Sequence, residues 1–287
     1  MRIALMGTGL IGTPMAEKLL EAGHDVMVYN RTAEKTVPLQ QKGAKIAKKP
    51  REAVAFADCT MLTLLDAHAI NSVLFQPGEK ADFTGKTIIQ MGTILSEESL
   101  ALKDKVSENG GDYLEALVLG SIPEVKAGKL IIMIGASQQQ FRKWQNLLQI
   151  FGPEPIYAGP VGKAAAMKLA LNQLIASLTA AFSLSLGMVQ RSGVDVELFM
   201  KIVRQSALYA PTYDKKLPRM LKRDYSNPNF PVKNLLKDMN LIYSEAKYLG
   251  LFTKGAKTII DILKIALQRG LEDQDYSALY EAIDPLE

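Results

Sequence analysis

Cysteine is nearly absent from this sequence: Cys59 is the only one among 287 residues, so no disulfide can form within the chain. Cys59 lies in the apolar run CTMLTLL, where a small buried side chain is expected rather than a reactive thiol. Sparing use of cysteine fits a reducing compartment, and Met1–Leu10 lacks the small-residue cleavage pattern of a signal peptide. We therefore expect a cytoplasmic protein.

Histidine and excess charge are also scarce. The chain has 2 histidines, and no His, Cys or Asp cluster has the spacing of a metal site, so we expect no metal. The formal net charge of +4 is dispersed along the chain and is too weak to indicate a nucleic-acid partner. We also expect no membrane-spanning run: the closest, LNQLIASLTAAFSLSLGMV, contains Asn172, Gln173 and several hydroxyl groups, and is typical of a buried helix.

Apolar runs and helical patterns alternate through the first half of the chain. Strands are indicated by RIALMG, DVMVYN, CTMLTLL, KTIIQMG, DYLEAL and KLIIMIGA, and helices by PMAEKLLEAG, AINSVLF and QQQFRKWQNLLQIFG. Such alternation predicts parallel strands with helices on both faces and right-handed crossovers.

Strand patterns end at Gly162. A helix is predicted from Lys163 to about Arg191, and more helices in VDVELFMKIVRQS, VKNLLKDMNLIYSEAKYLG and AKTIIDILKIALQRG. We therefore predict an α/β doubly wound parallel sheet in residues 1–161 and an all-helical domain in residues 162–287, joined by a long helix.

The stretch GTGLIG places Gly7, Gly9 and Gly12 in G-x-G-x-x-G spacing. It follows the strand RIALM and precedes the helix TPMAEKLLEAG, which is the context of a Rossmann-type dinucleotide site. The three glycines would allow the tight turn, the approach of a pyrophosphate and close helix–strand packing, and the helix N-terminus would attract phosphate. The competing interpretation is a purely structural glycine-rich turn.

The second strand ends in YNRT, where an NAD site would be expected to carry an acidic residue that holds the ribose. Asn30 is neutral here, Arg31 can pair with phosphate, and Thr32 can donate a hydrogen bond. A carboxylate would repel a 2′-phosphate, so this tip favours NADP (NADPH) over NAD. A solvated turn that is indifferent to the cofactor is the alternative.

Lys168 and Asn172 are four residues apart in the segment GPVGKAAAMKLALNQ and so share one helical face. Their neighbours are mostly Ala, Met and Leu. A lysine in apolar surroundings extends its amine to a surface or a cleft, where it can act as a proton donor. On the spacing alone, the more common interpretation of Lys168 is a lysine that places its amine in solvent and has no catalytic role.

Six segments, in order along nearly the whole chain, resemble the β-hydroxyacid dehydrogenase family: GTGLIGTPM, YNRT, MGTILSEES, EALVLGSIPEVKAGKL, GPVGKAAAMKLALN and FPVKNLLKDM. Among its members the sequence is most similar to the glyoxylate/succinic semialdehyde reductases and the 3-hydroxyisobutyrate dehydrogenases. The resemblance implies a Rossmann-type domain followed by a helical domain across one long helix. It also implies an active cleft between the domains and a homodimer or homotetramer.

The resemblance assigns a role to several side chains. Lys168 matches the catalytic lysine, which would protonate the carbonyl oxygen as hydride arrives, and Asn172 matches the amide that orients the substrate. Thr93 would lie by the nicotinamide ribose, Lys237 would contact the cofactor, and Asp238 would orient that region. The expected cofactor contacts are Gly7, Thr8, Gly9, Leu10, Ile11, Gly12, Asn30, Arg31, Thr32, Leu64, Leu65, Thr93 and Lys237.

The sequence departs from the family pattern at the expected substrate loop. Leu117 stands where the family has proline, and Leu119 replaces a serine whose hydroxyl helps hold the substrate carboxylate. Gly120 and Ser121 remain as N–H donors. The lost donor should cost about 1–3 kcal/mol of carboxylate binding. Lys163 and Ala164 also replace the usual Asn-Gly, so we expect the long helix to begin differently.

The leading hypothesis is NADPH-dependent reduction of a small aldehyde acid, with succinic semialdehyde ahead of glyoxylate. A second is NAD(P)-dependent oxidation of 3-hydroxyisobutyrate or a similar β-hydroxy acid. A third is a non-catalytic NADP-binding protein, since Leu119 would weaken binding of family substrates. Reduction of an uncharged imine is a fourth, because an apolar pocket suits it.

Overall fold

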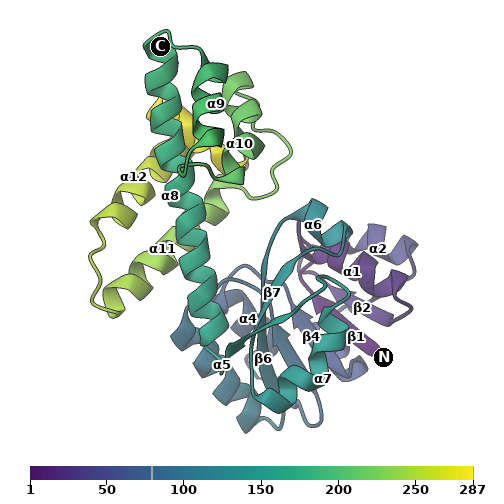
Figure 1. Cartoon of the computed structure of the whole chain (residues 1–287). Coiled ribbons are helices and arrows are strands. Elements are labelled where there is room, and N and C mark those ends of the chain that lie inside the picture. Colours follow the sequence, from purple (N-terminus) through teal and green to yellow (C-terminus); the bar gives the residue numbers. More distant parts are fainter. Residues whose placement is uncertain (79, 287) are drawn as a thin grey trace. The chain divides into compact units, whose positions relative to one another are not determined.

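The computed structural model describes residues 1–78 and 80–286 and contains two compact units, Met1–Lys168 and Leu169–Glu287 (Figure 1). Helix α8 (Lys163–Arg191) begins in the first unit and continues into the second. The division between the two compact units therefore falls inside this helix.

Unit 1 is built on an eight-stranded sheet in the order β3-β2-β1-β4-β5-β6-β7-β8. Its strands are β1 (Arg2–Met6), β2 (Asp25–Tyr29), β3 (Lys45–Ile46), β4 (Cys59–Leu62), β5 (Thr87–Gln90), β6 (Asp112–Leu119), β7 (Ile131–Gly135) and β8 (Ile156–Gly159). Neighbouring strands are parallel except at the β6–β7 pair. The predicted doubly wound sheet is confirmed, although the short strands β3 and β8 were not foreseen.

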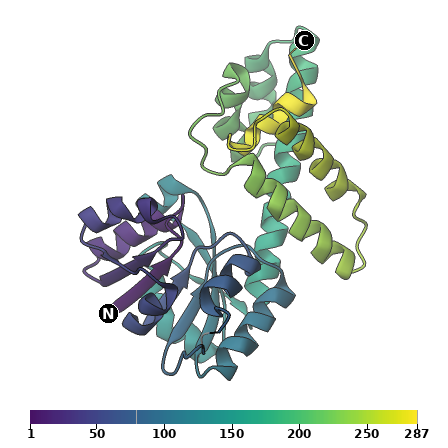
Figure 2. The ribbon, with the colours of Figure 1, turned by 180° about the vertical axis from the view of Figure 1, so that it is seen from behind.

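Helices cover both faces of this sheet (Figure 2). Along β1, Ile3 and Leu5 belong to one buried cluster, while Ala4 and Met6 belong to another on the opposite face. The helical elements of unit 1 before α8 are α1 (Gly12–Glu21), η1 (Ala33–Thr36), α2 (Val37–Gln41), α3 (Pro50–Phe56), α4 (Ala67–Leu74), α5 (Ser96–Glu108), α6 (Ile122–Lys126) and α7 (Gln138–Leu148). Burial of alternate residues on both faces explains why the strands are almost continuously apolar.

The carboxyl ends of β1, β2, β4, β5 and β6 share one edge of the sheet because these strands are parallel. Strand order reverses at β1, with β2 on one side and β4 on the other. Such a switch point is where doubly wound folds bind ligands. The expected cofactor turn follows β1 at this point.

Unit 2 is helical, as predicted. After α8 it contains α9 (Val196–Gln205), α10 (Pro211–Lys222), α11 (Val232–Tyr248), α12 (Lys254–Gln268), η2 (Tyr276–Leu279) and α13 (Tyr280–Ile283). Helices α11 and α12 lie side by side in both ribbon views (Figures 1 and 2). A buried ion pair joins α10 to the segment before η2, with Lys216 Nζ 2.7 Å from Asp275 Oδ1.

Helix α8 corrects one expectation. Its 29 residues include a window of mean hydropathy 1.5, so by length and composition alone it qualifies as a membrane span. No run of that kind was expected from the sequence. Phe182 and Leu186 of this helix are buried against α9 and α10 in the core of unit 2. These two side chains pack as in the core helix of a folded domain.

Candidate active site

The candidate residues form two groups, one in each unit. In unit 1 the glycine-rich turn has the close approaches that the motif requires. Gly7 has φ +102°, and a Cβ on Gly12 would lie 1.9 Å from the Gly7 carbonyl oxygen. A Cβ on Gly9 would meet nothing within 4 Å. Gly12 is therefore needed by the fold, whereas Gly9 leaves open space in which a ligand can approach the backbone.

The strand tip is tied to this turn by Asn30. Its Nδ2 donates to Thr8 Oγ1 at 2.9 Å, and its Oδ1 accepts from the Thr32 N–H at 2.9 Å. Arg31 and Thr32 remain exposed beside it. Ile11, the residue before α1, makes no side-chain cap bond, so the positive end of the helix dipole at this terminus suits a phosphate.

The ends of β4 and β5 complete the cofactor side. Thr63 Oγ1 donates to the Gly7 carbonyl oxygen at 2.6 Å, and a Cβ on Gly92 would lie 2.3 Å from the Leu64 carbonyl oxygen. The two segments therefore approach closely at this edge. Leu65 is exposed and Thr93 is half-buried. Thr63 was not identified from the sequence: it lies within the predicted strand run CTMLTLL, whereas the observed strand β4 ends just before it, at Leu62.

The loop after β6 differs from what the sequence led us to expect. The N–H and the hydroxyl of Ser121 both donate to Glu124 Oε2, at 2.7 and 2.6 Å. Leu119 is half-buried, and Gly120 is exposed. The donors of Ser121 are thus satisfied by a carboxylate of the protein itself. Glu124 was overlooked, although S-x-x-E before a helix is a readable capping signal.

Helix α8 begins as a regular helix at Lys163, which is exposed, while Ala164 is buried. The Ala164 N–H donates to Glu115 Oε2 at 3.2 Å. The replacement of the usual Asn-Gly therefore leaves the first turn helical. Lys168 is half-buried one turn later.

Glu115 is a fully buried acid that the sequence analysis did not single out. Burial raises the pKa of its carboxyl group above the ordinary value. The Ser99 hydroxyl and the N–H groups of Gly162, Ala164 and Ala165 oppose that rise in pKa, and of these the Ala164 N–H donates a hydrogen bond to Oε2. The only clue in the sequence was an acidic residue inside the apolar run DYLEAL.

The second group lies in unit 2. Asn172 Nδ2 donates to Asp238 Oδ2 at 2.6 Å, and Lys237 Nζ is 2.6 Å from Asp238 Oδ1. Asn172 and Asp238 are both buried. Asn172 Oδ1 is buried without a hydrogen-bond partner among the described residues, so the amide has an unused acceptor. Within residues 1–78 and 80–286 no cluster of three metal-ligating side chains occurs.

Taken with the sheet, the first group defines the class of protein. A glycine-rich turn at the switch point, leading into an uncapped helix N-terminus, is the dinucleotide-binding arrangement of the Rossmann type. The side chains at the other strand ends lie at the same edge of the sheet. This unit is a dinucleotide-binding domain.

Two family models match almost the whole chain. The NAD binding domain of 6-phosphogluconate dehydrogenase matches residues 2–159, and the NAD-binding domain of NADP-dependent 3-hydroxyisobutyrate dehydrogenase matches residues 162–283. The chain belongs to the β-hydroxyacid dehydrogenase family, and it is an NAD(P)-dependent oxidoreductase that acts on hydroxyl or carbonyl groups.

Similar proteins agree with this assignment. Glyoxylate/succinic semialdehyde reductase 2 of Arabidopsis thaliana, a chloroplastic protein, is 34% identical over 98% of this chain and 79% of its own. Glyoxylate/succinic semialdehyde reductase 1 of the same plant is 32% identical over 99% of this chain and 98% of its own. The crystal structure of 3-hydroxyisobutyrate dehydrogenase from Salmonella typhimurium has the same fold, with a TM-score of 0.85, 20% identity and coverage of 98% and 99%.

The two glycines Gly9 and Gly12 should respond differently to alanine. Gly12→Ala forces a methyl group onto the Gly7 carbonyl and should cost about 1–3 kcal/mol of stability without cofactor. Gly9→Ala meets open space and should leave the melting temperature unchanged, but should weaken dinucleotide binding about tenfold or more by crowding the pyrophosphate. Thermal unfolding and cofactor titration separate the two effects, and normal cofactor binding by Gly9→Ala would contradict this account.

Proposed function

We propose that the protein uses NADPH to reduce a small aldehyde acid, succinic semialdehyde in preference to glyoxylate, to the corresponding hydroxy acid. The observation that carries the proposal is one face of α8. It bears Lys168 and, one turn later, Asn172, whose amide is held by Asp238. A proton donor and an oriented acceptor on one helical face suit a carbonyl whose oxygen must be protonated.

Lys168 would act as the general acid. Its ammonium donates one proton to the carbonyl oxygen, and the neutral amine is later reprotonated from water. When bound, NADPH supplies the hydride that goes to the carbonyl carbon. Asn172 Oδ1 can accept a hydrogen bond from the product hydroxyl because its Nδ2 is already committed to Asp238.

The preference for NADPH is supported by the strand tip. Asn30 is neutral and so would not repel a 2′-phosphate as a carboxylate there would. Its amide bonds to Thr8 and Thr32 and holds the tip of the strand in place. Arg31 is exposed next to it and can pair with a phosphate through two parallel N–H bonds. The family model for residues 162–283 describes an NADP-dependent enzyme, which agrees.

The preference for succinic semialdehyde is supported by the loop after β6. Glyoxylate carries its carboxylate directly on the carbonyl carbon, so both groups must be held close together. Leu119 offers no hydroxyl, and Ser121 directs its N–H and hydroxyl to Glu124. A carboxylate separated from the carbonyl by a short chain can be held away from this loop.

Oxidation of a β-hydroxy acid such as 3-hydroxyisobutyrate is the second candidate. It is favoured by the description of the family model that matches residues 162–283. The same residues serve in reverse, with Lys168 accepting the hydroxyl proton as a neutral amine. Activity with a hydroxy acid and NAD(P), measured beside the aldehyde reduction, decides between the two.

Replacing Lys168 by alanine tests the proposed chemistry. We expect kcat for succinic semialdehyde to fall by about 10²–10⁴-fold, because a general acid is lost, while NADPH binding stays within about twofold. Lys103→Ala removes an exposed lysine of α5 in the same unit and is the matched control. A fully active Lys168→Ala protein would refute the assignment, and NADPH binding without turnover of any aldehyde or hydroxy acid by the wild type would favour a non-catalytic protein.

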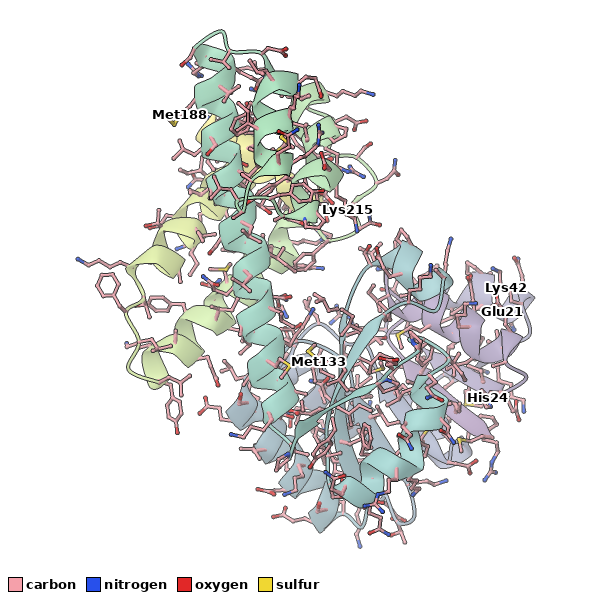
Figure 3. The ribbon with its side chains drawn as sticks, in the orientation of Figure 1. Glu21, His24, Lys42, Met133, Met188 and Lys215 are labelled. Carbon is pink, nitrogen blue, oxygen red and sulfur yellow. The ribbon has the colours of Figure 1, made fainter. Side chains whose placement is uncertain are left out.

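Replacing Arg31 by alanine tests the cofactor preference. Loss of a charged contact with the 2′-phosphate should raise KM for NADPH about tenfold or more and leave KM for NADH nearly unchanged. Lys42→Ala is the control, since Lys42 is an exposed base at the rim of the same unit, paired with Glu17 at 2.8 Å (Figure 3). An equal change in KM for NADPH and for NADH would show that Arg31 does not contact the 2′-phosphate.

Leu119→Ser tests the substrate loop. A serine hydroxyl restores a donor for a nearby carboxylate, so kcat/KM for glyoxylate should rise about tenfold while succinic semialdehyde changes less. Leu119→Ala enlarges the site without adding a donor and separates the two causes. If alanine and serine act alike on glyoxylate, space rather than hydrogen bonding governs the preference at this position.

A further inference from the structure

A carboxylate is buried where the sheet of unit 1 meets the first turn of α8. Glu115 is 0% exposed in β6, between Leu114 and Ala116, which are also 0% exposed. The Ala164 N–H donates to its Oε2 at 3.2 Å. The N–H groups of Gly162 and Ala165 also interact with this carboxylate. Burying an acid is costly unless hydrogen bonds or an ion pair offset the loss of hydration.

The surroundings of Glu115 are shaped to receive it. Gly135 of β7 pairs with Glu115 across the antiparallel ladder, and a Cβ there would lie 2.0 Å from Glu115 Oε2. A glycine on the neighbouring strand therefore makes the room for the carboxylate. On α5, the Ser99 hydroxyl also lowers the pKa of this carboxyl group, and it shares a 2.9 Å hydrogen bond with the Tyr113 hydroxyl.

The carboxylate serves as a helix cap that comes from the sheet. The first N–H groups of any α-helix lack partners within the helix and carry the positive end of its dipole. In α8, which has 29 residues, the Ala164 N–H of the first turn donates to Glu115, and the Lys163 N–H donates to the Pro160 carbonyl oxygen. The cap therefore fixes the start of the helix to the middle of β6.

Lys168 lies one turn after Ala164 on this capped part of the helix and belongs to the same unit. Side chains of helical residues lean toward the N-terminus, so the stem of Lys168 extends back over the turn that Glu115 holds. A shift of the first turn would move the amine with it. Small displacements of a reacting group lower rates strongly.

We propose that Glu115 is a positioning residue: by capping α8 from β6, it sets the place of the Lys168 ammonium relative to the sheet. The proposal rests on the function proposed above, in which Lys168 donates the proton. Because its side chain is fully buried, Glu115 would act only through the helix.

Glu115→Gln keeps the shape of the side chain but removes the charge that holds the N–H groups. We expect kcat for the preferred aldehyde to fall between about tenfold and a hundredfold, with Kd for NADPH unchanged. Glu115→Asp keeps the charge on a shorter chain and should recover part of the rate. Glu52→Gln is the matched control, because Glu52 caps α3 through the Lys48 N–H at 2.8 Å in the same unit, and it should change kcat less than about twofold.

A double-mutant cycle with Lys168→Ala separates positioning from general stability. If Glu115 acts through Lys168, Glu115→Gln should cause no further loss of kcat once Lys168 is alanine. An equal loss in both backgrounds would overturn the proposal, and so would a Glu115→Gln protein with wild-type kcat or one that fails to fold. The proposed function is judged separately, by the turnover of the wild type and its loss in Lys168→Ala alone.

Discussion

The parallel pairing of β1 with β2 on one side and β4 on the other is the constraint on which the candidate site depends. It brings the segments that follow these strands to one edge of the sheet, together with those after β5 and β6. The tight contact between Gly12 and the Gly7 carbonyl then sets α1 close against β1, with its first N–H groups at that edge. Every cofactor contact proposed in unit 1 follows from this arrangement.

Several polar groups in the interior of the two units are paired, and each pair fixes the orientation of a side chain or a helix end. Asp238 commits the amide nitrogen of Asn172 and leaves the oxygen as the acceptor. Glu115 takes up N–H groups at the start of α8, and Asp275 holds the ammonium of Lys216. In each case an acid buried at some energetic cost orients a nitrogen-bearing partner, which a purely apolar contact would not do.

Much of this architecture could be read from the sequence because it depends on local patterns. The apolar runs and the glycine-rich turn predicted the sheet, the helices of unit 2 and the cofactor edge, and Cys59 proved to be buried, with burial raising the pKa of its thiol to about 12. Short elements such as β3, with two residues, carry no periodic pattern and were missed. Glu115 and its partner Ala164 are 49 positions apart, and such a bond leaves no local trace.

Helix α8 carries Lys168 at the end of one unit and Asn172 near the start of the next without an intervening loop. Each residue of an α-helix advances the side-chain direction by about 100°, since a turn takes 3.6 residues. Inserting or deleting a single amino acid between the two positions would therefore rotate Asn172 off the helical face that it shares with Lys168. Divergence of this short segment among descendants of the gene should therefore proceed by exchange of side chains at constant length.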